Sequence, residues 1–248
     1  MSHPVEAVVF DWGGTLTPWH TVDLAEQWHV FARAHAEHVG LTAEQAGDLA
    51  RRILAAEDDA WRRAREHGGS ARMVEILGAA GFFESGAALE HAQQAYEEFW
   101  EPHTLIDPDV PALWRALRER GIRIGVLSNT IWTREYHERV FARDGVLDLV
   151  DGAVYSSEID HAKPHPQSFR AALAAVDVRD ARRVVYVGDR PFEDVHGAQQ
   201  VGMRAVWVPH SDIPRDQQVA GRGADDVVPD AVVQRLADLL EVVDSWNG

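Results

Sequence analysis

The residues best suited to chemistry stand directly after short apolar runs, and the first of them is Asp11. It follows the strand-like run Val8–Phe10 and precedes two glycines, Gly13 and Gly14. A carboxylate at the carboxyl end of a buried strand, next to glycines that let the backbone close on a ligand, is the layout of an aspartyl nucleophile. An aspartate also often ends a strand as a turn residue, so Asp11 alone leaves both interpretations open.

Three more polar motifs follow in a fixed order, and each closes an apolar strand or lies on the loop beyond one. They are Ser128-Asn129-Thr130, Lys163-Pro164, and Gly188-Asp189 with Asp194. Taken singly, they are explained equally well as a turn, a commonplace dipeptide and a helix N-cap. Parallel strands place ligands outside their carboxyl ends, so the joint occurrence of these motifs indicates one shared site.

Lys163 is the only lysine among 24 basic residues, and all the others are arginines. A GC-rich coding bias explains the excess of arginine. The retained lysine therefore indicates a role in a site, because a compact ammonium group and a planar guanidinium group suit different anions.

Two patterns divide the chain into the elements that would position these residues. Residues 18–104 predict four amphipathic helices, one of them opened by a capping box at Thr42, and such helices form a small bundle. Residues 1–17 and 105–248 instead alternate strands and helices, which predicts an α/β fold with a doubly wound parallel sheet. The helical block is then an insertion after the first strand.

The later strands are expected at residues 122–127, 152–155, 183–187 and 205–208, with a short edge strand at Val227-Val228. Pro229 is expected to open a last amphipathic helix that carries Leu236, Leu239 and Val243.

The motifs and their βα scaffold together resemble the haloacid dehalogenase-like (HAD) superfamily of phosphoryl-transfer hydrolases over nearly the whole chain. Residues 188–203, GDRPFEDVHGAQQVGM, match the fourth motif of that family closely. The resemblance implies that the helical insertion is the all-helical cap that closes over the active site in this superfamily.

The resemblance also implies roles for the strand-end residues. Asp11 would attack phosphorus and form an aspartyl-phosphate, Ser128 would donate its hydroxyl to a phosphoryl oxygen, and Lys163 would supply a fixed positive charge. Phosphoryl transfer depends mainly on such positioning and charge neutralisation. The cofactor would be Mg²⁺, for which the expected ligands are Asp11, the carbonyl of Gly13, Asp189 and Asp194.

The expected substrate is a small phosphorylated metabolite. Backbone amides near Gly14 and Asn129 would bind its anionic group, as at other strand-to-helix turns. The residues expected to contact substrate are Gly14, Thr15, Asn129, Trp19 and His20. Arg134 and Arg190 are candidates for a second anionic group, although exposed arginines are more often simply solvated.

Gly13 departs from the pattern of most phosphatases in the superfamily, which carry there a second aspartate that protonates the leaving group. Glycine cannot transfer a proton, and general acid–base catalysis is typically worth ~10²–10⁴-fold. His20 is a candidate substitute, because histidine exchanges protons near neutral pH. A surface histidine beside the cap is the competing interpretation.

Gly13 therefore leaves two alternatives to a Mg²⁺-dependent phosphohydrolase. One is a non-catalytic phospholigand-binding or regulatory protein. The other is a haloacid dehalogenase, which needs no metal and lacks the paired acids of the fourth motif, so that Asp189 and Asp194 argue against it. The chemistry of phosphonoacetaldehyde hydrolases is excluded, because it uses a cap lysine and residues 18–104 contain none.

The composition of the chain indicates which partners and which cellular setting to expect. A net charge of −16 disfavours non-specific binding to nucleic acid and favours a monomer or small homo-oligomer. The sequence contains no 18-residue apolar run, so we expect no membrane span. The first strand is expected to begin too early to leave room for a signal peptide. The absence of cysteine excludes disulfides and thiolate metal sites, and it suggests a cytoplasmic setting.

Overall fold

The computed structural model describes residues 3–18, 22–209 and 227–248. Contacts divide the chain into two compact units, of which one comprises Met1–His20 with Ile106–Gly248 and the other comprises Thr21–Leu105. We call them the core unit and the helical unit. The core unit carries the strands of the described residues and the helical unit carries only helices.

A six-stranded parallel sheet forms the centre of the core unit, as predicted. Its strands are β1 (Ala7–Phe10), β2 (Arg123–Ser128), β3 (Gly152–Tyr155), β4 (Val184–Gly188), β5 (Arg204–Trp207) and β6 (Ala231–Val232). Their spatial order is β3-β2-β1-β4-β5-β6, so the chain grows outward from β1 on one side and then returns to its other side. β1 thus lies where the strand order reverses, the position at which doubly wound sheets bind ligands.

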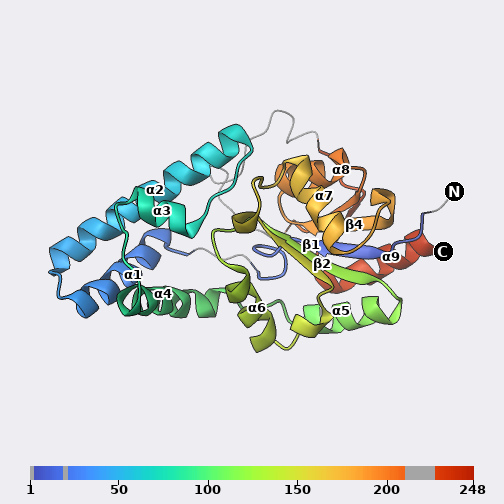
Figure 1. Cartoon of the computed structure of the whole chain (residues 1–248). Helices are drawn as coiled ribbons and strands as arrows, with labels where there is room; N and C mark the ends of the chain where they lie inside the picture. The colour runs from blue at the N-terminus through green and yellow to red at the C-terminus, as the bar shows by residue number, and fades with distance from the viewer. Residues whose placement is uncertain (1–2, 19–21, 210–226) are drawn as a thin grey trace. The chain divides into compact units, whose positions relative to one another are not determined.

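Helices cover both faces of this sheet (Figure 1). The helices α5 (Val110–Glu119) and α9 (Leu239–Asn247) lie on one face, and α7 (Pro166–Ala175) and α8 (Gly197–Gln200) lie on the other. Because both faces are covered, β1 and β4 are buried throughout and consist largely of valine. The helix α6 (Arg134–Arg143) follows β2.

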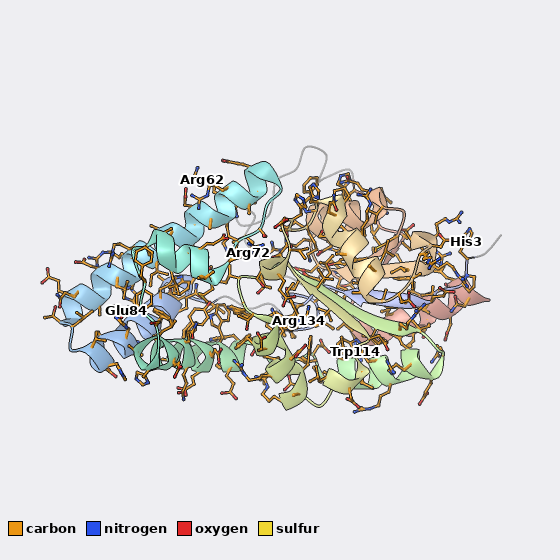
Figure 2. All side chains as sticks on the ribbon, viewed as in Figure 1. His3, Arg62, Arg72, Glu84, Trp114 and Arg134 are labelled. Atoms are coloured by element: carbon orange, nitrogen blue, oxygen red, sulfur yellow. The ribbon has the colours of Figure 1, made fainter. Side chains whose placement is uncertain are left out.

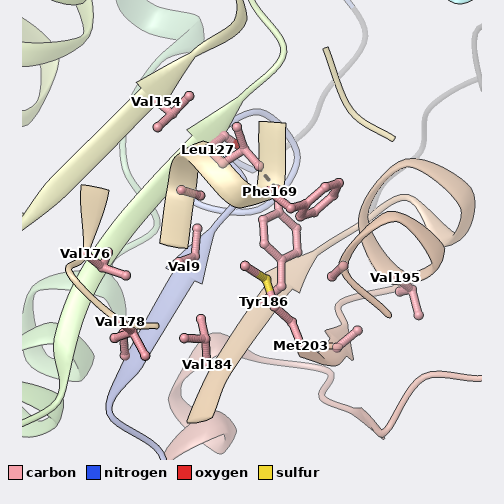
Figure 3. Close-up of a cluster of buried hydrophobic side chains, with 14 residues drawn as sticks. Val9, Leu127, Val154, Phe169, Val176, Val178, Val184, Tyr186, Val195 and Met203 are labelled. Carbon is pink, nitrogen blue, oxygen red and sulfur yellow. Dashed lines mark hydrogen bonds between the residues drawn. The ribbon is translucent and has the colours of Figure 1, made fainter. Parts of the chain in front are cut away.

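Aromatic side chains fill the two faces. On one face Trp114, labelled in Figure 2, is fully buried and packs its ring against Phe10 and Phe141 at centroid distances of 5.8 and 5.9 Å. On the other face the rings of Phe169 and Tyr186 meet edge to face at 5.1 Å (Figure 3). These contacts hold α5, α6 and α7 against the sheet, and so hold the strand ends in place.

The predicted edge of the sheet is wrong by several residues. Val227-Val228 forms no strand, and the edge strand is Ala231–Val232, which pairs with Val206 and Trp207 of β5. Val227 instead packs against the hydrophobic core while Val228 is 75% exposed. The last helix consequently begins at Leu239 and not at Pro229.

The helical unit contains α1 (Leu24–Val39), α2 (Ala43–His67), α3 (Met73–Ala79) and α4 (Ala87–Trp100). The predicted capping box at Thr42 is confirmed: the Thr42 hydroxyl accepts from the Gln45 amide and the Gln45 side chain accepts from the Thr42 amide. Trp28 and Phe31 of α1 are fully buried and pack with Tyr96 and Phe82. None of the described helices is both long and apolar enough to cross a membrane.

Candidate active site

The parallel register brings three of the predicted site residues to one edge of the sheet. Phe10 of β1 pairs with Val126 of β2 and Val187 of β4, and the Asp11 amide continues the ladder by donating to the Val187 carbonyl at 2.8 Å. The strand ends therefore carry Asp11, Ser128 and Asp189 within about one residue of the same level. All three are at most 5% exposed.

Lys163 links Asp11 to two further buried residues. Its Nζ is 2.7 Å from Asp11 Oδ1, 2.7 Å from Asp194 Oδ1 and 3.0 Å from the hydroxyl of Tyr186. A lysine ammonium has three N–H donors, so these partners use all of them. The ammonium group of Lys163 therefore lies against Asp11, and Asp194 and Tyr186 share the same group.

Burial and charge set the protonation of these groups. Burial raises the pKa of Asp11 to about 6; Lys163 opposes the rise, whereas Asp194 adds to it. Burial by itself lowers the pKa of Lys163, but Asp11 and Asp194 together leave it above its ordinary value. Lys163 is therefore a permanent cation between two carboxylates.

Tyr186 is a member of the cluster that the sequence did not reveal. It is fully buried in β4, and its hydroxyl donates to the Leu127 carbonyl at 3.1 Å while accepting from Lys163. Figure 3 shows Tyr186 beside Phe169, with a dashed line marking its hydrogen bond. A tyrosine within a valine run was the only sequence signal, and it is equally typical of ordinary core packing.

The side chain of Asn129 connects two loops of the site. Its side-chain Oδ1 accepts from the Lys163 amide at 2.8 Å, and its Nδ2 donates to the Lys163 carbonyl at 3.0 Å. This pair of bonds ties the loop after β2 to the loop that carries Lys163. Asn129 thus positions the lysine backbone, and Ser128 stands beside it at the end of β2.

The turn after Asp11 is closed by its own backbone. The Gly14 amide donates to the Thr17 carbonyl at 2.8 Å, and the Thr17 amide donates to the Trp12 carbonyl at 2.9 Å. The Gly14 amide is therefore not directed at a ligand, contrary to the prediction. The Thr15 hydroxyl, fully buried, lies 3.4 Å from Asp189 Oδ1.

Gly14 and Gly13 differ sharply in what surrounds them. Gly14 has a φ of +83°, and a Cβ there would lie 2.5 Å from Asp189 Oδ2. Only glycine fits, because the conformation and the space both exclude a side chain. A Cβ on Gly13 would meet no described atom within 4 Å, and the φ of Gly13 is not positive. The predicted contacts Trp19 and His20 lie outside the described residues.

The carboxylates can hold a divalent cation. One oxygen from each of Asp11, Asp189 and Asp194 lies within 4.8 Å of the others. Oxygen donors of this kind fit Mg²⁺. Asp194 is already engaged, since its Oδ1 bonds Lys163 and its Oδ2 accepts from the Arg190 amide at 2.9 Å. Asp11 and Asp189 are therefore the better candidates for direct ligands, with Asp194 bracing them.

A charge count supports the same conclusion. The three aspartates and the buried Glu193 face two cations, Lys163 and Arg190. If all four acids are ionised, the cluster keeps two negative charges at a site with little water. A divalent cation would balance that charge.

Comparisons with known proteins agree with this architecture. Residues 5–202 match the family described as haloacid dehalogenase-like hydrolase. Glyceraldehyde 3-phosphate phosphatase from Pyrococcus abyssi is 31% identical over 132 residues, which are 53% of this chain and 52% of that protein. Ribulose-1,5-bisphosphate 5-phosphatase from Halopiger xanaduensis is 28% identical over 96% of this chain and 98% of its own length.

A solved structure of similar overall length is the 2-haloacid dehalogenase from Pseudomonas syringae. It superposes with a TM-score of 0.63 and is 25% identical, covering 98% of this chain and 99% of that one. By contrast, the alignments with the first curated relatives span only a little over half of those relatives' length.

Proposed function

The chain belongs to the haloacid dehalogenase-like hydrolase family, and we propose that it is a Mg²⁺-dependent phosphatase acting on a small phosphorylated metabolite. The observation that carries this proposal is the arrangement of Asp11, with Lys163 bonded to one oxygen and the Asp189 carboxylate close enough to share a cation. The names of the relatives given above, which refer to phosphorylated sugars and trioses, support the substrate class.

In this proposal Asp11 is the nucleophile. Lys163 holds Asp11 Oδ1 at 2.7 Å, which leaves the other carboxylate oxygen to attack phosphorus. The P–O bond to the leaving alcohol breaks as the bond to Asp11 forms, giving an aspartyl-phosphate that water then hydrolyses. A Mg²⁺ ion bound by Asp11 and Asp189 would neutralise charge on the phosphoryl oxygens.

The neighbouring residues act by positioning. Ser128 stands at the end of β2, where its hydroxyl can donate to a phosphoryl oxygen. Asn129 fixes the loop of Lys163, and Asp194 with Tyr186 fixes the ammonium group. A rigid constellation of this kind matters because phosphoryl transfer gains most from pre-set geometry.

Gly13 offers no proton donor for the leaving group. A Cβ on Gly13 would meet no described atom within 4 Å, so the described residues leave room for a donor from the substrate, from water or from another residue. His20 stays the candidate that the sequence suggested. We therefore expect faster turnover of esters whose leaving group needs little protonation.

A dehalogenase is the second candidate, because a 2-haloacid dehalogenase shares the fold at 25% identity. The cluster of Asp11, Asp189 and Asp194 favours the phosphatase, since three buried carboxylates so close together need a cation beyond the one lysine, and a reaction without metal would not supply it.

A test compares the purified protein with p-nitrophenyl phosphate and with 2-chloropropionate, with Mg²⁺ and with excess chelator. We expect release of nitrophenol that stops with chelator and returns with Mg²⁺, and no chloride release. Asp11→Asn should reduce the activity to background, because an amide is a poor nucleophile. Circular dichroism should show that this variant keeps the wild-type fold. Activity that survives chelation contradicts the proposed Mg²⁺ dependence. Activity that survives in Asp11→Asn contradicts the assignment of Asp11 as the nucleophile.

A further inference from the structure

Arg190 is held directly beside the candidate metal ligands. It follows Asp189, and its backbone amide donates to Asp194 Oδ2 at 2.9 Å. Asp194 is fully buried and also bonded to Lys163, so the chain at Arg190 has little freedom. The side chain of Arg190 is 25% exposed, which gives it access to solvent and to a ligand.

One end of the guanidinium group is fixed and the rest is available. Nη1 of Arg190 donates to Glu193 Oε2 at 2.7 Å, and the Glu193 side chain is only 7% exposed. Its Nε and Nη2 donate to no residue in the described part of the chain. Burial lowers the pKa of Arg190, but Glu193, Asp189 and Asp11 outweigh it and raise the pKa. The group is thus close enough to Asp189 and Asp11 to interact electrostatically with both.

The two cations of the cluster differ in how many of their N–H donors are used by the described residues. Lys163 uses its three donors on Asp11, Asp194 and the Tyr186 hydroxyl. Arg190 keeps unused donors in a planar fork, the geometry that binds a carboxylate or phosphate through two parallel hydrogen bonds.

Arg134, the other arginine that the sequence suggested, lies on α6 (Figure 2). It is engaged by Glu158, at 2.6 Å, and by the Ala153 carbonyl, at 3.1 Å. It is therefore not equivalent to Arg190.

We propose that Arg190 binds a second anionic group of the substrate, a carboxylate or a phosphate that is not the one transferred. This inference rests on the proposed phosphatase function. Glu193 orients the guanidinium and keeps it from collapsing onto the Asp11 and Asp189 carboxylates. The preferred substrates are then phosphorylated acids or bisphosphates, and simple monophosphates are poorer.

Matched probes test this assignment. Phosphoglycolate and ethyl phosphate have nearly the same size, but only the first has a carboxylate, and ethylene glycol bisphosphate supplies a phosphate in its place. For wild type we expect a kcat/KM about ten- to hundredfold higher for a probe with the second anion, the usual effect of hydrogen bonds to a charged group. The better of the two doubly anionic probes identifies the chemical class. Equal kcat/KM for all three probes overturns the role of Arg190.

Variants separate specificity from structure. Arg190→Ala should lower kcat/KM for the doubly anionic probes about ten- to hundredfold more than it lowers kcat/KM for ethyl phosphate. Arg190→Lys, which keeps the charge without the fork, should fall between the two and guards against a folding defect in the alanine variant. Arg182→Ala is the control, because it removes one exposed arginine from the same unit and should change no probe. An equal loss on all probes in both Arg190 variants overturns the proposal in favour of a structural role.

The same experiment distinguishes this inference from the proposed function. p-Nitrophenyl phosphate has no second anion. Mg²⁺-dependent hydrolysis of it that persists in Arg190→Ala, with a further loss confined to the doubly anionic probes, supports both proposals together. A wild-type protein inactive on every phosphate contradicts the phosphatase itself, whereas a uniform loss on all phosphates confined to the Arg190 variants contradicts only the second-anion site.

Discussion

Two carboxylates with shifted pKa values, the buried Asp11 of the core unit and the half-buried Glu57 of the helical unit, differ in the partners that surround them. Asp11 is bonded to the ammonium group of Lys163. Among the described residues, the hydrogen-bond donors to Glu57 are neutral, namely the Trp28 indole at 2.6 Å and the Gln27 amide at 3.2 Å. Burial is the largest cause in both cases, and it raises the pKa of Asp11 to about 6 and that of Glu57 to about 7.

The difference shows what a cation contributes. Burial disfavours a charged carboxyl anywhere, and a group without a counter-ion responds by taking up a proton near neutral pH. Glu57 can do this because nothing in its hydrogen bonds requires a charge. A nucleophile must stay ionised, so Asp11 needs Lys163 and, in our proposal, a divalent cation. The charged environment of Asp11 in the core unit is therefore suited to catalysis, and the neutral environment of Glu57 in the helical unit is suited to packing.

Removing the lysine tests this comparison most strongly. Lys163→Met leaves Asp11 and Asp194 without their cation, and we expect kcat to fall by about 10²–10³-fold or more. Lys163→Arg should lose nearly as much, because a guanidinium group is too large for a space where Nζ lies 2.7 Å from two oxygens. The measurement is steady-state turnover of p-nitrophenyl phosphate, with circular dichroism as the check on folding. A Lys163→Arg protein with wild-type kcat and KM would show that charge alone matters.

A carboxylate added beside the cluster tests the opposite change. Gly13→Asp places an acid in open space, and we expect it to speed hydrolysis of sugar phosphates by about tenfold or more, while aryl phosphates gain less. The observable is kcat/KM for the two ester types. Gly14→Ala is the contrasting variant, since its Cβ would strike Asp189, and it should lose activity on both. A uniform loss in Gly13→Asp, with the fold intact, would refute the idea that only an acid is missing.

The sequence predicted the framework of the site because it depends on local patterns. Apolar runs ending in polar residues located Asp11 and Asp189, and parallel pairing then made them neighbours. The contacts across the chain were not predictable. Asn129 and Lys163 are 34 residues apart in the sequence, and Tyr186 and Leu127 are 59 residues apart. No rule of sequence spacing predicts either contact. The same limit explains the misplaced edge strand. Val227-Val228 and Ala231–Val232 are both apolar pairs that could pair with β5, and only tertiary packing decides between them.

Replacing Glu57 by glutamine tests the other half of the comparison, with a smaller expected effect. Burial raises the pKa of Glu57 from its ordinary value of 4.5 to about 7, so folding favours its protonated form. Its contribution to stability is therefore complete below about pH 4.5 and is lost as the pH rises through about 7. Glutamine is permanently neutral and can still accept from the Trp28 indole. We expect Glu57→Gln to unfold with a free energy roughly 1–3 kcal/mol higher than wild type at pH 8, and with a difference below about 1 kcal/mol at pH 5.

Urea unfolding of the full chain at both pH values, followed by tryptophan fluorescence, measures this difference. Glu66→Gln on the same helix is the control, because Glu66 is exposed and its replacement should change stability by the same small amount at each pH. Because Glu57 lies in the helical unit and outside the proposed catalytic cluster, kcat at saturating substrate should follow wild type at pH 7. A Glu57→Gln protein that is less stable at pH 8 would mean that Glu57 is held as an anion by its neutral donors. The contrast between the two carboxylates would then lie in geometry, since the hydrogen bonds from Trp28 and Gln27 would stabilise the charged form of Glu57 without a cation.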